Sequence, residues 1–292
     1  MNPSAEAWRD RGEHRTLCGH RVFTVDLPSS GARSLAPLLI LHGFPTSSFD
    51  FHHVVDRIAA HRRVLLFDML GYGLSEKPDL AYTFSLQADI ATAFVRELGI
   101  DRLALLTHDV GDTVGGELLA RQLEGGWDMT ITERGLANGS IYSPLVQLSD
   151  GQHLLLSLPD ATLPENMGPD QTAVMAGVAA TFSPHSQVDP DELEAQWEMI
   201  AHLDGHLLLP RLIRYVEERR RSEARFTGAI ERHPSPLTIV WGRDDPIAVP
   251  AMADRLRHAR PDATVSILEG VGHYPMSEAP DRFLDALGSL AG

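Results

Sequence analysis

The sequence of 292 residues has one cysteine, Cys18, and few basic residues. A single cysteine cannot form a disulfide within the chain, which fits a reducing compartment. Lysine and arginine together number 25, against 40 aspartates and glutamates, so the formal charge is −15. Nucleic acids and anionic membranes bind basic surfaces. The charge balance therefore argues against either of them as the main partner.

Long apolar runs and targeting segments are also missing. No apolar stretch approaches the ~20 residues that a membrane-spanning helix needs. Residues 1–15 are polar and contain no apolar core of a signal peptide. We therefore expect a soluble, cytoplasmic protein with no membrane partner.

Metal and cofactor motifs are absent from the pattern as well. Neither HExxH nor CxxC spacing occurs. His52 and His53 are adjacent, so they would face different ways on the helix predicted for residues 48–60. The glycines within 111–116 lack the G-x-G-x-x-G arrangement, and the glycine-rich run 68–75 lacks the lysine-serine pair that ends a Walker motif. We expect no metal and no cofactor.

The sequence does contain short apolar runs that alternate with helical patterns. This alternation predicts an α/β fold, in which helices flank a mostly parallel sheet. The predicted strands are 20–27 (in a hairpin), 37–41, 64–67, 103–106, 131–138, 237–241 and 264–268. The predicted helices are 48–60, 85–98 (with Ser85 as N-cap), 110–123, 251–259 and 280–287.

The alternation stops near Tyr142 and resumes after Phe226. Between these residues the pattern is helical, and its loops are rich in proline, glycine and aspartate. The chain is thus expected to divide into a core, residues 1–141 and 227–292, and a helical insert, residues 142–226. The insert follows the fourth predicted parallel strand.

The residues after the strand 103–106 carry a first chemical signal. Thr107-His108-Asp109-Val110-Gly111 joins this strand to a helix, which is the context of a nucleophile elbow. The sharp turn needs a small residue two positions to either side of its centre. Gly111 meets this need, and Thr107 meets it less well. The centre is Asp109, although an aspartate after a strand is often only a helix N-cap.

A second motif, His42-Gly43-Phe44-Pro45, directly follows another predicted strand. In this context the loop bends back and presents a backbone N–H to the site. We expect the N–H groups of Phe44 and Val110 to form an oxyanion hole, with His42 and His108 beside the substrate. The spacing of the two motifs favours a nucleophile over a helix cap.

Two further loops supply an acid and a histidine. Asp245 follows the strand 237–241 and is preferred to its neighbour Asp244, because it lies three residues past Gly242. His273 follows the strand 264–268. Nucleophile, acid and histidine then stand in the chain order of the α/β-hydrolase arrangement.

Together these motifs resemble the α/β-hydrolase superfamily over essentially the whole chain. The branch is that of epoxide hydrolases and haloalkane dehalogenases, and the sequence is similar to the mesoderm-specific transcript group. The runs that carry the likeness are HGFPTSS at 42–48, HDVGD at 108–112, ELLA at 117–120, NG at 138–139, TVSIL at 264–268 and HYP at 273–275. The resemblance implies a hydrolase core with a helical cap.

The resemblance also implies a proton donor for an epoxide oxygen, because cap tyrosines have this role in epoxide hydrolases. Tyr215 shares a helical face with Leu208 and Leu212, so it points toward core or pocket, where packing is an equally good interpretation. Tyr142, where the chain enters the insert, is the second candidate. Trp197 could donate an N–H to an anion or simply pack.

The sequence therefore predicts an epoxide hydrolase, a monomer or a homodimer, that acts on a small apolar or amphipathic substrate. It would form a vicinal diol through an ester on Asp109. His273 would activate the water that cleaves this ester, and Asp245 would orient the imidazolium. A haloalkane or haloacid dehalogenase could use the same aspartate. However, Phe44 and Val110 stand where haloalkane dehalogenases usually have an amide side chain and a tryptophan. An ester or lactone hydrolase, or a non-catalytic ligand-binding protein of the same fold, would also fit these motifs.

Overall fold

The computed structural model describes residues 2–31 and 35–292. They form an eight-stranded sheet in the order β1-β2-β4-β3-β5-β6-β7-β8. β2 pairs antiparallel with β1 and with β4, and the other neighbours pair in parallel. The predicted α/β fold with a mostly parallel sheet is confirmed.

Every predicted strand is present, and β1 completes the hairpin. The strands are β1 (Gly12–Leu17), β2 (His20–Leu27), β3 (Leu38–Leu41), β4 (Val64–Phe67), β5 (Arg102–His108), β6 (Thr130–Ala137), β7 (Leu237–Gly242) and β8 (Thr264–Leu268). The α-helices are α1 (Pro3–Arg9), α2 (Val55–Ala59), α3 (Phe84–Glu97), α4 (Val110–Leu123), α5 (Asp150–Ser157), α6 (Gln171–Ala179), α7 (Pro190–Ala201), α8 (Leu209–Leu212), α9 (Tyr215–Arg232), α10 (Ala251–Ala259), α11 (Pro275–Glu278) and α12 (Pro280–Leu287). Short 3-10 helices are η1 (Ser48–Phe51), η2 (Ser143–Leu145), η3 (Glu165–Met167), η4 (His202–Leu208) and η5 (Gly288–Leu290).

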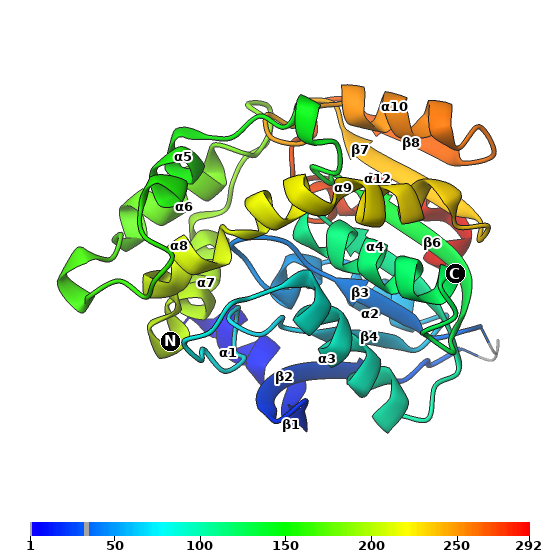
Figure 1. The fold of residues 1–292 in the computed structure, drawn as a ribbon, viewed down its shortest axis with the longest axis horizontal. Helices are drawn as coiled ribbons and strands as arrows, with labels where there is room; N and C mark the ends of the chain where they lie inside the picture. Colours follow the sequence, from blue (N-terminus) through cyan, green and yellow to red (C-terminus); the bar gives the residue numbers. More distant parts are fainter. Residues whose placement is uncertain (1, 32–34) are drawn as a thin grey trace.

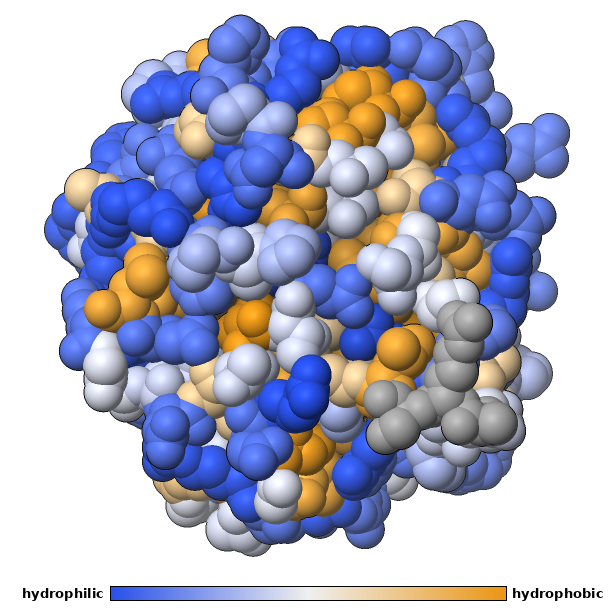
Figure 2. All heavy atoms as spheres, turned by 90° about the vertical axis from the view of Figure 1, so that its right-hand side faces the viewer, coloured by the Kyte–Doolittle hydropathy of each residue, from blue (hydrophilic) through white to orange (hydrophobic). Residues whose placement is uncertain are grey.

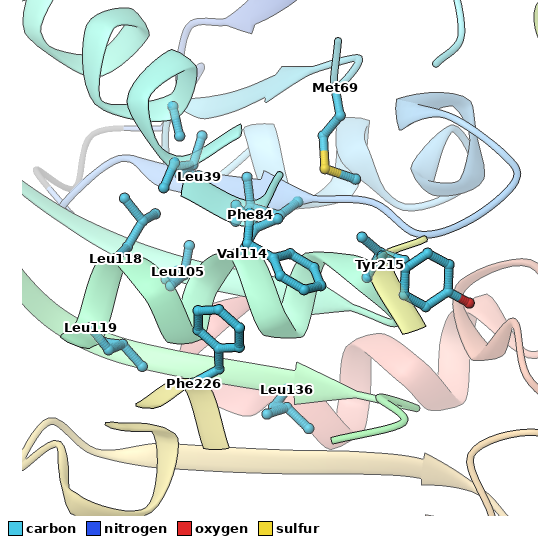
Figure 3. Packing of buried hydrophobic residues seen from close by; sticks show 14 of the residues in the cluster. Leu39, Met69, Phe84, Leu105, Val114, Leu118, Leu119, Leu136, Tyr215 and Phe226 are labelled. Atoms are coloured by element: carbon cyan, nitrogen blue, oxygen red, sulfur yellow. The ribbon is translucent and has the colours of Figure 1, made fainter. Parts of the chain in front are cut away.

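Both faces of the sheet are covered by helices, as β3 illustrates. Its side chains alternate between the faces because a strand has a period of two. Leu39 and Leu41 pack in a cluster with residues of α3, α4 and α9, part of which Figure 3 shows. Leu38 and Ile40 pack on the other face with residues of α2 and α12. Strands buried on both faces are almost continuously apolar, which made them recognisable in the sequence.

Two local predictions are wrong. The helix predicted for 48–60 is divided into η1 and α2 by a turn that contains His52 and His53. Phe49 and Phe51 are both buried in one cluster, although residues two positions apart point to opposite sides of a regular α-helix. The N-cap of α3 is Thr83, whose side chain accepts a hydrogen bond from the backbone of Leu86, and not Ser85.

Between β6 and β7 the described chain contains helices and loops but no strand. Helices α5 to α8 gather at one end of the sheet, at the left of Figure 1. The last helix of this segment, α9, is interrupted at Ser222 and continues along α4. The boundary expected after Phe226 therefore falls inside α9, because this helix belongs to both the insert and the core.

The outer surface mixes apolar and polar residues. Figure 2 views the end of the molecule that faces away from α5 to α8, where groups of apolar residues are separated by hydrophilic ones. Such a mixture is usual, because polar groups alone cannot cover a domain. None of the described helices is both long and apolar enough to cross a membrane.

Helices α4 and α9 approach closely because Gly116 has no side chain. A Cβ at Gly116 would lie 2.8 Å from the carbonyl oxygen of Phe226 in α9. Gly177 in α6 has the opposite environment, since a Cβ there would meet nothing within 4 Å.

We predict that Gly116→Ala lowers the free energy of unfolding by about 1–3 kcal/mol, the usual cost of overpacking. Gly177→Ala is the matched control and should raise it by up to about 1 kcal/mol, because alanine is the better helix former. Urea unfolding of both variants measures the difference. A Gly116→Ala protein as stable as the parent would contradict the close packing of α4 against α9.

Candidate active site

Asp109 lies on a strained turn between β5 and α4. Its backbone has φ 49° and ψ −110°, a conformation that residues other than glycine rarely adopt. Gly111 permits the turn, because a Cβ there would lie 2.3 Å from the carbonyl oxygen of Leu41 in β3. Strand, turn and helix thus form an elbow with Asp109 at its apex.

One oxygen of the Asp109 carboxylate is held and the other is free. Oδ2 accepts a hydrogen bond of 2.9 Å from the backbone N–H of Phe44. Oδ1 is buried and has no hydrogen-bond partner among the described residues. Since the lone pairs of Oδ1 are not engaged by a donor, this oxygen of Asp109 is the one available for nucleophilic attack. The backbone N–H of Val110, the first residue of α4, also has no partner inside the helix.

His273 and Asp245 form the second half of the site. His273 Nδ1 lies 2.8 Å from Asp245 Oδ2, and both side chains are buried. The backbone N–H groups of Ile247 and Ala248 donate to Asp245 Oδ1 at 2.8 and 2.9 Å. Because a carboxylate only accepts, Nδ1 carries a proton and Nε2 is the atom left for chemistry. The neighbouring Asp244 instead accepts from a serine hydroxyl of the insert.

Asn138 is a positioning residue that sequence reasoning did not assign. Its Nδ2 donates to Asp245 Oδ2 at 2.6 Å and to the carbonyl oxygen of Gly272 at 3.2 Å. Its Oδ1 accepts from the backbone N–H of Gly242 at 3.1 Å. This one side chain therefore joins the ends of β6 and β7 to the loop after β8. The available signal was its position directly after β6, at the sheet edge that also presents Asp109.

The charges around His273 favour its protonated form. Burial lowers the pKa of this imidazole, but the charge of Asp245, the hydrogen bond to it and the charge of Asp109 together raise the pKa to about 9. His273 is therefore a cation at pH 7 while Asp109 is charged. If Asp109 became a neutral ester, the pKa of His273 would fall and the imidazole could act as a base.

Asp112 is a second buried carboxyl close to the elbow. Burial raises the pKa of this carboxyl well above its usual range, which favours its neutral form. The hydroxyl of Thr107 donates to it, which gives this residue of β5 a structural role. The buried guanidinium of Arg219 donates to the carbonyl oxygens of Ser140 and Asp109, at 3.1 and 3.4 Å.

A cavity of about 170 Å³ brings the two halves together. Phe44, Asp109, His273 and Tyr274 line it from the core. The insert contributes mainly apolar side chains: Leu154, Leu155, Ala173, Val174, Val178 and Leu209. An apolar lining excludes water, which strengthens the interactions of the few charged groups inside.

Tyr215 lies just behind the wall of this cavity. Its ring centroid is 5.5 Å from that of Phe44, and Figure 3 shows its hydroxyl pointing away from the packed side chains of the core. Gln152, which lines the cavity, donates from Nε2 to the Tyr215 hydroxyl at 3.3 Å. Burial and the charge of Asp109 raise the pKa of the Tyr215 phenol, so it keeps its proton.

Two residues named from the sequence lie away from the cavity. The hydroxyl of Tyr142 donates to Glu231 at 2.8 Å, and the guanidinium of Arg255 stacks 4.2 Å from its ring centroid. Trp197 is half-buried in α7, where its ring packs beside His206. Neither lines the cavity, so the structure does not support Tyr142 as a proton donor or Trp197 as an anion ligand. Chain position alone does not fix where a side chain points.

His42 and His108 support the site from outside the cavity. His42 Nε2 accepts from the backbone N–H of Met69, and its Nδ1 donates to the carbonyl oxygen of Gly43. This side chain therefore fixes the loops after β3 and β4 relative to each other. His108 Nε2 lies 2.8 Å from the carbonyl oxygen of His273. Burial and the charge of His273 lower the pKa of His108 to about 4, so it is neutral.

Tyr274 and Gln152 line the cavity but were not singled out from the sequence. Tyr274 follows His273 directly, and that position was a usable signal because both belong to one strand-end loop. Burial and the charge of Asp50 raise the pKa of the Tyr274 phenol. Gln152 forms a capping box with Ser149 at the start of α5, a pattern that gives no indication of a pocket.

We predict that Asp109→Asn lowers the pKa of His273 from about 9, because a negative charge beside the imidazolium is lost. Asp112→Asn is the matched control, since burial favours the neutral form of that carboxyl and an amide is neutral as well. A nuclear magnetic resonance titration of the imidazole, assigned with His273→Gln, measures both. An unchanged pKa in Asp109→Asn, or an equal fall in the control, would contradict this coupling.

Known proteins resemble this chain over almost its whole length. The model of the alpha/beta hydrolase family matches residues 38–286. LipZ of Mycobacterium tuberculosis, named only as a hydrolase, is 35% identical over 296 residues, which cover 99% of this chain and 98% of that protein. The mesoderm-specific transcript homolog protein of Bos taurus is 33% identical over 303 residues, 98% of this chain and 87% of that protein. The resemblance to this group is confirmed.

Haloalkane dehalogenases are similar over a shorter stretch. The enzyme of Agrobacterium fabrum is 36% identical over 97 residues, 33% of this chain and 30% of that protein. Among solved structures, a loop variant of the haloalkane dehalogenase DbeA from Bradyrhizobium elkanii superposes with a TM-score of 0.74 at 20% identity, covering 96% of each chain. At that identity the likeness concerns the fold.

Proposed function

Because the chain belongs to the alpha/beta hydrolase family, we propose that it is a hydrolase of the epoxide hydrolase type with Asp109 as nucleophile. The observation that carries the proposal is the free, buried Oδ1 of Asp109 beside an apolar cavity. A carboxylate can displace at an sp3 carbon and leave an ester on the enzyme, whereas a serine suits acyl transfer. The substrate is a small apolar epoxide, and residues 142–226 act as the cap over it.

In the first step Asp109 Oδ1 attacks a ring carbon of the epoxide. A carbon–oxygen bond of the ring breaks, and the departing oxygen takes a proton from a tyrosine. Tyr215 and Tyr274 are the two candidates, because one contacts the wall residue Gln152 and the other lines the cavity. The first step leaves a hydroxyalkyl ester on Asp109 and a tyrosinate.

In the second step water attacks the carbonyl carbon of the ester. The ester has removed the charge of Asp109, so the pKa of His273 falls and the imidazolium gives its Nε2 proton to the tyrosinate, which restores the tyrosine. The neutral Nε2 then takes a proton from the attacking water. Asp245 stabilises the imidazolium that forms again, and the N–H of Phe44 stabilises the oxyanion. Collapse releases the diol, which takes the proton from His273, and the new carboxylic acid returns its own proton to Nε2, so that the Asp109 carboxylate and the imidazolium are both restored.

Dehalogenation is a second candidate, which the likeness to the Agrobacterium fabrum enzyme favours. A departing halide needs N–H donors around it, and the side chains of Phe44 and Val110 provide none. The amide of Gln152 is the nearest substitute in the cavity, but it donates to Tyr215. The epoxide proposal therefore ranks first.

We predict that the protein converts small aliphatic and aromatic epoxides to vicinal diols. Asp109→Asn should lower the rate of this turnover by more than about 10⁴-fold. Chromatographic quantification of diol from an epoxide panel measures it, with halide release from a haloalkane panel measured in parallel. Halide without diol would replace the proposal with dehalogenation. No product from either panel would refute both reactions.

We predict that Tyr274→Phe and Tyr215→Phe each lower kcat for the best epoxide, by about 10²-fold if that phenol is the main donor. Tyr142→Phe is the matched control and should keep full activity, because its hydroxyl bonds Glu231 away from the cavity. Full activity of both Tyr274→Phe and Tyr215→Phe would show that the proton comes from elsewhere.

A further inference from the structure

His52 and His53 lie together on the turn that separates η1 from α2. Their ring centroids are 3.8 Å apart, so the expectation that adjacent histidines face different ways is wrong here. A regular helix would have separated the rings by a rotation of about 100°, whereas this turn directs them to one side. His52 stacks on Phe49, and its Nδ1 hydrogen-bonds the carbonyl oxygen of Phe49 at 2.8 Å.

Glu192 reaches these histidines from the first turn of α7. Its Oε2 lies 3.4 Å from His53 Nε2, and its Oε1 lies 4.0 Å from His52 Nδ1. Oε1 is buried and has no hydrogen-bond partner among the described residues. A buried carboxylate oxygen without a donor is energetically unfavourable, so a cation bound to this oxygen would stabilise it.

We propose that His52, His53 and Glu192 form a binding site for a divalent transition metal ion, with zinc as the best match. One ligand atom from each side chain can be chosen so that all three lie within 4.8 Å of one another. Ligands around a tetrahedral zinc are about 3.4 Å apart, given bonds of about 2.0–2.2 Å. Binding of the ion would therefore draw the three side chains closer together.

The chemistry of the donor set favours zinc over calcium or magnesium. Two imidazoles and one carboxylate suit a borderline-soft ion, whereas the alkaline-earth ions prefer sets made only of oxygen. His52 Nδ1 donates to the carbonyl oxygen of Phe49, so Nε2 is the nitrogen that is left to bind a metal. His53 is 41% exposed, so solvent can enter and supply the fourth ligand.

The charges around the site also favour a cation. Glu192 provides one negative charge, and that of Asp189 acts on His53 in the same sense. Arg11, the cation that acts on His52, is already paired with Asp56. A metal here would join the core turn to a helix of the insert, and none of its three ligands lines the catalytic cavity.

Titration of Zn²⁺ into tag-free protein that has been treated with a chelator and dialysed tests the proposal. We expect one equivalent to bind with micromolar or tighter affinity, measured by calorimetry, and to raise the melting temperature. Co²⁺ in the same site should show the visible absorption of a four- or five-coordinate ion without a thiolate band, since no cysteine is a ligand.

Glu192→Gln and His53→Gln should each weaken zinc binding by at least tenfold and remove the rise in melting temperature. His258→Gln is the matched control, because His258 is an exposed histidine on α10 without such neighbours in the described structure. Melting temperatures without metal show that the variants are folded. No binding by the parent, or binding that is unchanged in both ligand variants, would overturn the proposal.

Discussion

The strained turn at Asp109 is the constraint on which the rest of the site depends. Gly111 packs against the backbone of β3, and this close approach permits the turn that directs the aspartate outward at the carboxyl edge of the sheet. Parallel strands end at the same edge, so the loops after β3, β7 and β8 bring Phe44, Asp245 and His273 to the same place. Without the turn, the same residues would be a helix start and three unrelated loops.

The protonation state of His273 also depends on the charges of the two carboxylates beside it. Asp109 and Asp245 together hold His273 in its cationic form, although burial alone would favour the neutral one. A reaction that neutralises Asp109 would therefore release the proton-accepting capacity of His273 at the step that needs it. Asn138 and the two backbone N–H groups on Asp245 keep that carboxylate fixed while the charges change.

Much of this arrangement could be predicted from the sequence, because it depends on local rules. A buried strand followed by a turn and a helix identified Asp109, and strand order separated His273 from thirteen other histidines. Directions of side chains were less accessible. Tyr142 points toward Glu231 and Arg255, whereas Tyr274 points into the cavity. Both directions depend on packing between segments that are distant in the sequence. His52 and His53 meet on a turn that divides the predicted helix, beside the buried Phe49 and Phe51.

The central claim is that an ester forms on Asp109 and is cleaved at its own carbonyl carbon. A single turnover with enzyme in excess over an epoxide, carried out in heavy-oxygen water, tests this most directly. Mass spectrometry of the peptide that contains Asp109 and of the diol shows where the solvent oxygen is found. We predict the label in the carboxylate of Asp109 and not in the diol. Label in the diol from the first turnover would contradict the account, because water would then have attacked the substrate itself.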